Sequence, residues 1–196
     1  MRSMWLRLVA VLSLLFLFGC GEYGKVDQGR CVAYDKDKKA VTMIRDVKND
    51  AAKPEYTHLP AIVYTMPSDP KEVGPDPKAG GRMKLDPEKN EIVLFDSKAQ
   101  NFVHIPFTMV EKKDNVGKED ELVKDKKLPA IDNDKKTVTI YSGRQKLYMV
   151  VQVDAGAVEK YNEKDFDSGD ECRVYYKEDG KALRFMNVSK TDIFKK

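Results

Sequence analysis

The chain has 196 residues, of which 34% are charged, and its 35 Lys and Arg nearly balance its 32 Asp and Glu. This length suits one domain or two small ones. Because the charges of both signs are interspersed, with no clustered excess of Lys and Arg, we expect no nucleic-acid partner.

The N-terminus predicts a secretory signal that ends at a lipid-modified cysteine. Arg2 and Arg7 precede an apolar run from Leu8 to Phe18, which closes in the tetrad Leu17-Phe-Gly-Cys20. This tetrad resembles the lipobox of bacterial lipoproteins, which implies that residues 1–19 are a cleaved signal peptide and that Cys20 carries a diacylglyceryl anchor. The alternative, a membrane-spanning helix, needs roughly 20 apolar residues, more than this run supplies.

The signal also predicts where the protein resides. Cleavage removes Arg2 and Arg7 and lowers the formal charge from +3 to +1. Gly21, and not Asp, follows the cysteine, which by analogy with Gram-negative sorting favours the outer membrane, on its periplasmic side. We therefore expect a protein of the cell envelope whose membrane contact is the lipid at Cys20.

Four β-hairpins are predicted after a short polar tether at residues 20–28. Each consists of two β-prone runs joined by a polar turn. Three of the turns begin with Asp, whose side chain accepts a hydrogen bond from the backbone further along a type I turn. The paired runs are 31–34 with 41–44, 82–85 with 92–95, 130–131 with 138–141, and 173–176 with 182–185.

The remaining segments predict single strands, loops and one helix. Residues 66–81 contain four prolines and predict a long exposed loop, because proline cannot donate to a central strand. The stretch 111–127 is almost wholly charged. We expect a helix at 157–166 and further strands at 61–64, 102–105, 107–110, 146–153 and 192–194.

These elements predict a mainly β protein with two small five-stranded barrels in tandem. Each half has three strands, a spacer and two more strands, as in barrels of the oligonucleotide-binding or SH3-like kind. The domains would be 29–111 and 128–196, with a charged linker at 112–127. Two alternatives are a single domain in which 112–127 is a surface loop, and a four-bladed arrangement.

A family resemblance rests on Gly24–Asp35 (GKVDQGRCVAYD) and Val41–Asp46. These segments resemble a small group of bacterial lipoproteins that share a domain of unknown function. The resemblance implies a family that covers most of the mature chain. It implies no activity and no functional residues.

The two cysteines that remain after Cys20, Cys31 and Cys172, predict one disulfide. An isolated pair outside the cytoplasm most often forms a bridge. They open the first and fourth hairpins, which are equivalent places in the repeated unit. The alternative is two buried thiols that pack as small apolar side chains. Their number excludes a multi-cysteine metal site.

Candidate metal ligands have simpler explanations. The Asp-x-Asp pairs at 35–37 and 132–134 resemble the start of a calcium loop, but Lys stands at the fifth position of each, where a ligand is required. His58 and His104 lack the spacing of a metal or haem motif. We therefore expect no metal and no cofactor.

Aromatic side chains within the predicted strands are a further candidate binding surface. If they were exposed on a barrel face, they could stack against sugars or bases. The simpler interpretation is that most are core residues or cross-strand pairs. They are Tyr34, Tyr64, Phe95, Tyr141, Tyr148, Tyr175, Tyr176 and Phe185.

Two hypotheses of function follow. The first is a lipid-anchored, non-catalytic binding or scaffolding module with a protein partner, since the sequence has no nucleophile–base constellation. The second is an enzyme, or its ligand-binding accessory, that acts on cell-wall glycan through acidic side chains, although a solvated turn explains these equally well. The acidic side chains are Asp165, Asp167, Asp170 and Glu171.

Overall fold

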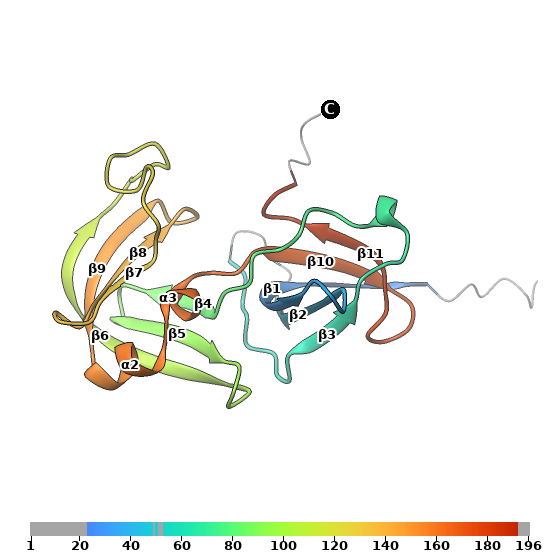
Figure 1. The fold of residues 1–196 in the computed structure, drawn as a ribbon, viewed down its shortest axis with the longest axis horizontal. Helices are drawn as coiled ribbons and strands as arrows, with labels where there is room; N and C mark the ends of the chain where they lie inside the picture. The colour runs from blue at the N-terminus through green and yellow to red at the C-terminus, as the bar shows by residue number, and fades with distance from the viewer. Residues whose placement is uncertain (1–22, 49, 51–52, 192–196) are drawn as a thin grey trace, which may run out of the picture.

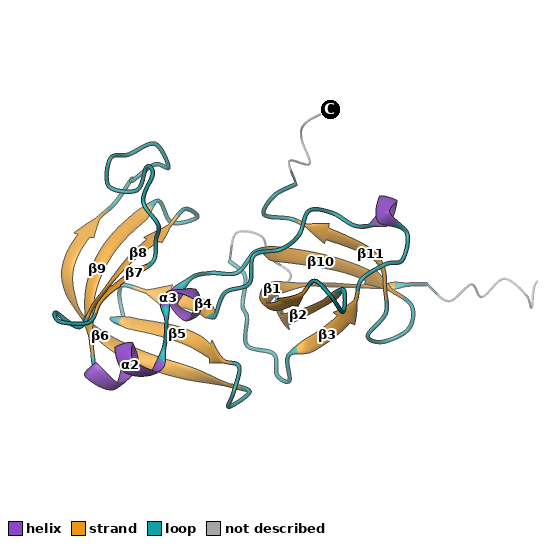
Figure 2. Ribbon diagram, viewed as in Figure 1, coloured by secondary structure: helices purple, strands orange, loops and turns teal. Residues whose placement is uncertain are grey.

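The computed structural model describes residues 23–48, 50 and 53–191. The lipobox, Cys20 and the strand expected at 192–194 lie outside the described residues. The described chain is mainly β, with eleven strands in two antiparallel sheets and only short helices (Figures 1 and 2).

The first sheet has five strands in the order β11-β10-β1-β2-β3. Its core is apolar and includes Cys31, Val41, Met43, Tyr64 and Phe185. The backbone of Thr65 donates to the carbonyl of Gly180 at 2.8 Å, so the β3 edge approaches the β10–β11 turn. The strands are β1 (Lys25–Asp35), β2 (Ala40–Arg45), β3 (Ile62–Thr65), β10 (Glu171–Tyr176) and β11 (Ala182–Asn187).

The second sheet has six strands in the order β4-β5-β6-β9-β8-β7. Two helices pack on it, α2 (Ala155–Lys160) and α3 (Glu163–Phe166), and they bury Val158 and Phe166 in its core. The strands are β4 (Arg82–Asp86), β5 (Glu91–Asp96), β6 (Asn101–Lys113), β7 (Ala130–Asp132), β8 (Thr137–Ser142) and β9 (Leu147–Val153).

All four predicted hairpins are confirmed as β1–β2, β4–β5, β7–β8 and β10–β11. Their turns have the expected chemistry: Asp35 accepts a hydrogen bond from the amide of Lys38 at 2.9 Å, and Asp132 accepts one from Lys135 at 3.0 Å. The turns end at Lys39 and Lys136, which have positive φ. These aspartates therefore bind their own turn amides.

The two strands expected at 102–105 and 107–110 are one long strand, β6. Its first part pairs with β5, up to Pro106, and its second part pairs with β9, from Phe107 onward. Proline has no N–H to donate, and Pro106 lies where the pairing partner changes. The helix expected at 157–166 is divided into α2 and α3, because Asn162 caps the start of α3.

The order of strands differs from the predicted tandem arrangement. β1 pairs with β10 over six residue pairs, from Lys25 opposite Tyr176 to Arg30 opposite Glu171. The first sheet thus takes strands from both ends of the chain, and the second sheet is inserted between them. No closed barrel is formed by the strands of the described chain. The chain is nested and not divided at 112–127.

The charged segment 112–127 belongs to the second sheet. Its first residues are the end of β6, and the rest connects β6 to β7. Val116 and Val123 are buried against Tyr148 of β9. The connection therefore folds onto the sheet and is not a free linker between domains.

The two sheets also share an apolar cluster. Val32 and Ile44 of the first sheet pack with Met83 and Phe95 of the second, and Tyr56 joins them from the β2–β3 loop. Beside this cluster the chain crosses between the sheets twice, at 78–82 and 167–171. Hydrogen bonds tie both crossings to β1: Gly80 N–H donates to Cys31 O at 3.1 Å, and Cys31 N–H donates to Asp170 O at 2.9 Å. The sheets are thereby joined as one body.

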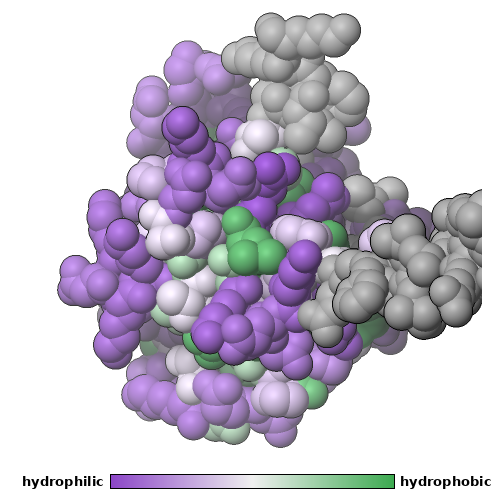
Figure 3. Space-filling model, turned by 90° about the vertical axis from the view of Figure 1, so that its right-hand side faces the viewer, coloured by the Kyte–Doolittle hydropathy of each residue, from purple (hydrophilic) through white to green (hydrophobic). Residues whose placement is uncertain are grey.

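The outer end of the first sheet is mostly hydrophilic, as the composition predicts. Figure 3 views the first sheet from its outer end and shows purple side chains with only small apolar islands. No helix of the described chain has both the length and the hydrophobicity that a membrane span requires.

Candidate functional site

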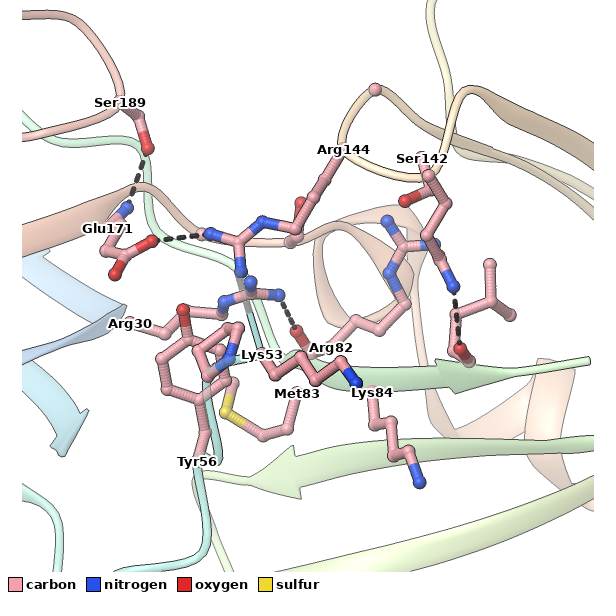
Figure 4. Close-up of a pocket in the computed structure, with 16 residues that line it drawn as sticks. Arg30, Lys53, Tyr56, Arg82, Met83, Lys84, Ser142, Arg144, Glu171 and Ser189 are labelled. Atoms are coloured by element: carbon pink, nitrogen blue, oxygen red, sulfur yellow. Dashed lines mark hydrogen bonds and ion pairs between the residues drawn. The ribbon is translucent and has the colours of Figure 1, made fainter. Parts of the chain in front are cut away.

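A cavity of about 470 Å³ lies at the junction of the two sheets. The first sheet contributes the middle of β1 and the start of β10, and the second contributes β4 and the β8–β9 turn. Figure 4 shows Arg30, Arg82 and Arg144 around this space, with Arg144 turned toward Glu171 and Arg30 against the backbone of Arg82. The cavity is thus formed only when both sheets are assembled.

The lining of this cavity is strongly cationic. It includes three arginines and two lysines, but Glu171 is the one carboxylate among the described lining residues. Two of the cations have acidic partners: Arg144 pairs with Glu171 at 2.6 Å, and Lys84 pairs with Asp86 at 2.8 Å. The cations are Arg30, Lys53, Arg82, Lys84 and Arg144.

Arg82 is the most unusual residue of the site. It is only 4% exposed, and no carboxylate in the described chain forms an ion pair with it. Its Nη2 donates weakly to the carbonyl of Tyr141 at 3.4 Å, while its Nη1 is buried with no hydrogen-bond partner. A buried charge without a partner is costly. Burial, together with the nearby charge of Arg30, lowers the pKa of Arg82 to about 10, although Asp167 opposes the shift.

Arg30 is held beside Arg82 by two contacts. Its Nη1 donates to the backbone carbonyl of Arg82 at 3.0 Å, and its guanidinium lies 4.3 Å from the ring centre of Tyr56. Its Nε is buried with no hydrogen-bond partner in the described structure. Burial also raises the pKa of Tyr56. Arg30 and Arg82 therefore both line the cavity, and neither has a carboxylate partner among the described residues.

Glu171 closes the opposite wall and is fully engaged. One carboxylate oxygen accepts from Arg144 at 2.6 Å, and the other accepts from the side-chain amide of Gln28. Arg173 in turn donates to Gln28, at 2.6 Å. Glu171 therefore orients Arg144 and has no free oxygen directed at the two unpaired arginines.

The four acidic residues of the glycan hypothesis do not form a pair suited to acid–base chemistry. Each has its own structural partner: Asp165 accepts from Asn162 N–H at 3.0 Å as part of a capping box, and Asp167 pairs with Lys78 at 2.9 Å. Asp170 accepts from the side-chain amide of Asn187 at 2.9 Å. Of the four, only Glu171 lines the cavity.

The histidines and turn aspartates are not brought together. His58 Nδ1 lies 3.3 Å from Arg45, and His104 Nδ1 lies 3.0 Å from Glu91 on the surface. Within the part of the chain that the structure describes, no group of three His, Cys, Asp or Glu side chains could hold a metal ion.

Most of the strand aromatics are packed inward. Tyr64 and Tyr176 lie in the core of the first sheet with their ring centroids 5.1 Å apart and their planes tilted by 51°, and both donate to Asp27. Phe95 and Tyr148 are also buried. Tyr56, which the strand pattern did not single out, is the aromatic residue of the cavity.

The predicted disulfide is not present. Cys31 and Cys172 are fully buried free thiols on neighbouring strands. In the β1–β10 register Cys172 lies opposite Gly29, so the cysteines are diagonal neighbours. Diagonal α-carbons are ~7–8 Å apart, which is beyond the usual disulfide range. A hydrogen bond with Cys31, together with burial, raises the pKa of the Cys172 thiol.

The cationic site was not predicted, because its residues are far apart in sequence. Arg30, Arg82 and Arg144 each stand among other charged or polar residues and look like surface cations. Only the pairing of β1 with β10 and the insertion of the second sheet bring them together.

Comparisons with known proteins support one part of the family resemblance, namely the domain of unknown function. Neither the curated proteins nor the solved structures contain a match to this chain. A family described as a domain of unknown function, DUF4881, matches residues 22–196. Since the match covers almost the whole chain, the protein belongs to the DUF4881 family.

Proposed function

We propose that this protein is a lipid-anchored, non-catalytic binding module of the cell envelope, and that it holds an anionic group of its partner in the cavity between the two sheets. The observation that carries the proposal is Arg82, a buried cation whose Nη1 has no partner in the described structure and which lines a cavity. An anion in the cavity would supply the missing partner.

The proposal also includes the membrane location of the protein and the fold type of its first sheet. Cys20 carries the lipid, on the outer membrane and facing the periplasm, and the tether expected at 20–28 ends before Lys25, where β1 begins. The contact between Thr65 and Gly180 supports a small barrel-like form of the first sheet, of the oligonucleotide-binding or SH3-like kind. Folds of this kind commonly serve binding functions.

The engagement of the acidic residues favours this function over glycan hydrolysis. Hydrolysis of a glycosidic bond requires two carboxyl groups that flank the bond. The cavity has one described carboxylate, and that one is held by Arg144 and Gln28.

Anion binding by the mature protein tests the proposal. Isothermal titration with phosphate, sulfate and acetate at constant ionic strength should show saturable binding in the wild type. Arg82→Met should abolish it. Arg184→Met is the matched control, because it removes the same charge from an exposed arginine that pairs with Glu72. If no anion binds, or if both variants weaken binding equally, the cavity is not a specific anion site.

Lipid anchoring is tested separately. Cys20→Ser should release the protein from the membrane fraction or leave an uncleaved precursor. A wild-type protein that is wholly soluble without detergent, with its mature N-terminus elsewhere, would contradict the anchor.

A further inference from the structure

The charge of the cavity is matched to a particular kind of anion. Arg30 and Arg82 both line it: Arg30 Nη1 donates to the backbone carbonyl of Arg82 at 3.0 Å, and the Arg82 guanidinium extends to the carbonyl of Tyr141. Neither has an ion pair within the described chain, and each has one buried nitrogen without a hydrogen-bond partner. The site therefore has two guanidinium groups without an ion pair, and the exposed Lys53 is a third lining cation for which no ion pair is seen in the described chain.

This inference rests on the proposed anion-binding function and specifies its ligand. We infer that the cavity binds a phosphomonoester group as its dianion, with Arg30 and Arg82 as the cations that balance its charge. A phosphomonoester carries a charge of about −1.5 to −2 at neutral pH and offers three terminal oxygens. That charge balances two guanidinium groups, and the oxygens can accept from both.

A monocarboxylate fits the same cavity less well. Its single charge would leave one of the two arginines uncompensated in a buried position, which is unfavourable. A planar carboxylate is well suited to one bidentate guanidinium, as in the pair of Arg144 with Glu171. That pair already occupies the third arginine, so the remaining two act together.

The surroundings of the two arginines favour a compact, dehydrated contact. Tyr56 covers one face of the Arg30 guanidinium at 4.3 Å, and Tyr56 and Met83 are 5% and 6% exposed. Charged groups interact more strongly where water is excluded.

The titration of the ligand itself provides a sharp test. The second proton of a phosphomonoester leaves near pH 6, so the dianion fraction rises about tenfold between pH 5 and pH 7.5. Binding of methyl phosphate to the wild-type protein should strengthen by about the same factor. Binding of sulfate, which is a dianion throughout this range, should change little. Acetate should bind at least tenfold more weakly than methyl phosphate at pH 7.5.

Two variants connect this binding to the two arginines. Arg82→Met and Arg30→Met should each lower the affinity for methyl phosphate at least tenfold and remove its pH dependence. Arg184→Met should retain both. Circular dichroism and unfolding midpoints establish that each variant is folded before its affinity is compared.

The phosphomonoester could belong to a soluble ligand or to a lipid headgroup, and vesicles distinguish these sources. Phosphatidic acid presents a phosphomonoester, whereas phosphatidylglycerol presents a singly charged diester. Arg82-dependent binding of the soluble Cys20→Ser variant to phosphatidylcholine vesicles with phosphatidic acid, but not with phosphatidylglycerol, indicates the lipid source. Binding of methyl phosphate without such vesicle binding indicates a soluble ligand.

The outcomes separate the two proposals. Acetate binding as tight as methyl phosphate, or methyl phosphate binding that does not change from pH 5 to pH 7.5, overturns the phosphomonoester inference and leaves the anion site standing. The absence of binding by any of the anions overturns both.

Discussion

Arg144, at the turn between β8 and β9, reaches across to Glu171, the first residue of β10, with 2.6 Å between Nη2 and Oε2. The turn belongs to the second sheet and β10 to the first. Ser189 strengthens this link, because its hydroxyl accepts from the Glu171 N–H at 2.8 Å. The pair therefore connects the two sheets at one wall of the cationic cavity.

Loss of Arg144 should destabilise the protein. Arg144→Gln removes a charged hydrogen bond from a buried carboxylate, which should lower the free energy of unfolding by about 1–3 kcal/mol. Urea denaturation at neutral pH measures this loss of unfolding free energy. Lys112→Gln, in the exposed pair of Lys112 with Asp114, is the control and should change stability by less than about 0.5 kcal/mol. Equal effects of the two changes would mean that Arg144 does not connect the sheets.

Glu171 should also limit anion affinity, because it places a negative charge beside the arginines. Glu171→Gln keeps a side chain of similar shape and removes that charge, so phosphate binding should strengthen several-fold. Glu178→Gln, on the exposed β10–β11 turn, is the control and should leave the affinity unchanged. Titration of both variants with inorganic phosphate compares them, and weaker binding by Glu171→Gln would contradict this electrostatic role.

Arg82→Met should raise stability in the absence of ligand. The change replaces a buried, unpaired charge with an apolar side chain, and replacement of buried ion pairs by apolar groups gains up to ~1–4 kcal/mol. In a domain of this size each 1 kcal/mol of added unfolding free energy raises the thermal unfolding midpoint by roughly 2–4 °C. Differential scanning calorimetry measures the midpoint. Saturating phosphate should raise the midpoint of the wild type but not of Arg82→Met.

The contrast between local and long-range features explains what the sequence could predict. The turn at Asp35–Lys39 depends on residues within five positions, and its hairpin was predicted correctly. The pairing of β1 with β10 joins residues 141 to 151 positions apart, from Arg30 with Glu171 to Lys25 with Tyr176, and leaves no local pattern. Because the tandem arrangement was inferred from repeated local units, it missed this pairing.

The cationic site was missed for the same physical reason. Arg82 stands in a strand beside Met83 and Lys84, where alternation would place a charged side chain toward solvent. In the structure a register shift between Arg82 and Lys84 interrupts this alternation, and Arg82 is buried with its Nη2 near the carbonyl of Tyr141 in β8. The cysteines show the opposite case: their proximity was predicted, but the register makes them diagonal neighbours and not a bonded pair.

Asp96 should make stability depend on pH. Lys160, the amides of Ala99 and Lys98, and Tyr161 bind its carboxylate and hold its pKa well below the usual value of 3.8. Between the folded and unfolded pKa values the unfolded state binds more protons, so stability falls as pH falls. This contribution is complete above about pH 5 and is lost progressively below about pH 4.

Comparison of Asp96→Asn with the wild type measures this contribution. The variant should be less stable at pH 7, and the difference should shrink as the pH is lowered to 3. Asp37→Asn, in an exposed turn, is the control and should match the wild type at both pH values. A difference that stays constant with pH would assign the effect of Asp96 to packing.

Gly169 should be essential for the double crossing between the sheets. A Cβ at this position would lie 1.8 Å from the carbonyl oxygen of Cys31, which is backbone and cannot move aside. Gly169→Ala should therefore destabilise by more than about 4 kcal/mol or prevent folding. Gly117→Ala is the matched control, since no atom lies within 4 Å of its Cβ. A soluble Gly169→Ala protein with a wild-type unfolding midpoint would contradict this crossing.

Cleavage between β6 and β7 distinguishes the nested arrangement from the tandem one. A protease site inserted after Gly117, in the exposed part of the connection, divides the chain into β1–β6 and β7–β11. Each sheet then contains strands from both fragments. The fragments should therefore stay together under native conditions, even with reductant, because the cysteines are free thiols.

Size-exclusion chromatography of the cut protein should show one species at the volume of the uncut chain. After separation in denaturant, each fragment alone should lack the β-sheet signal in circular dichroism, since each would have unpaired strand edges and an incomplete core. Mixing the two fragments should restore the signal. Two fragments that fold independently would instead support domains divided at 112–127. They would contradict the nested arrangement, in which each sheet needs strands from both fragments.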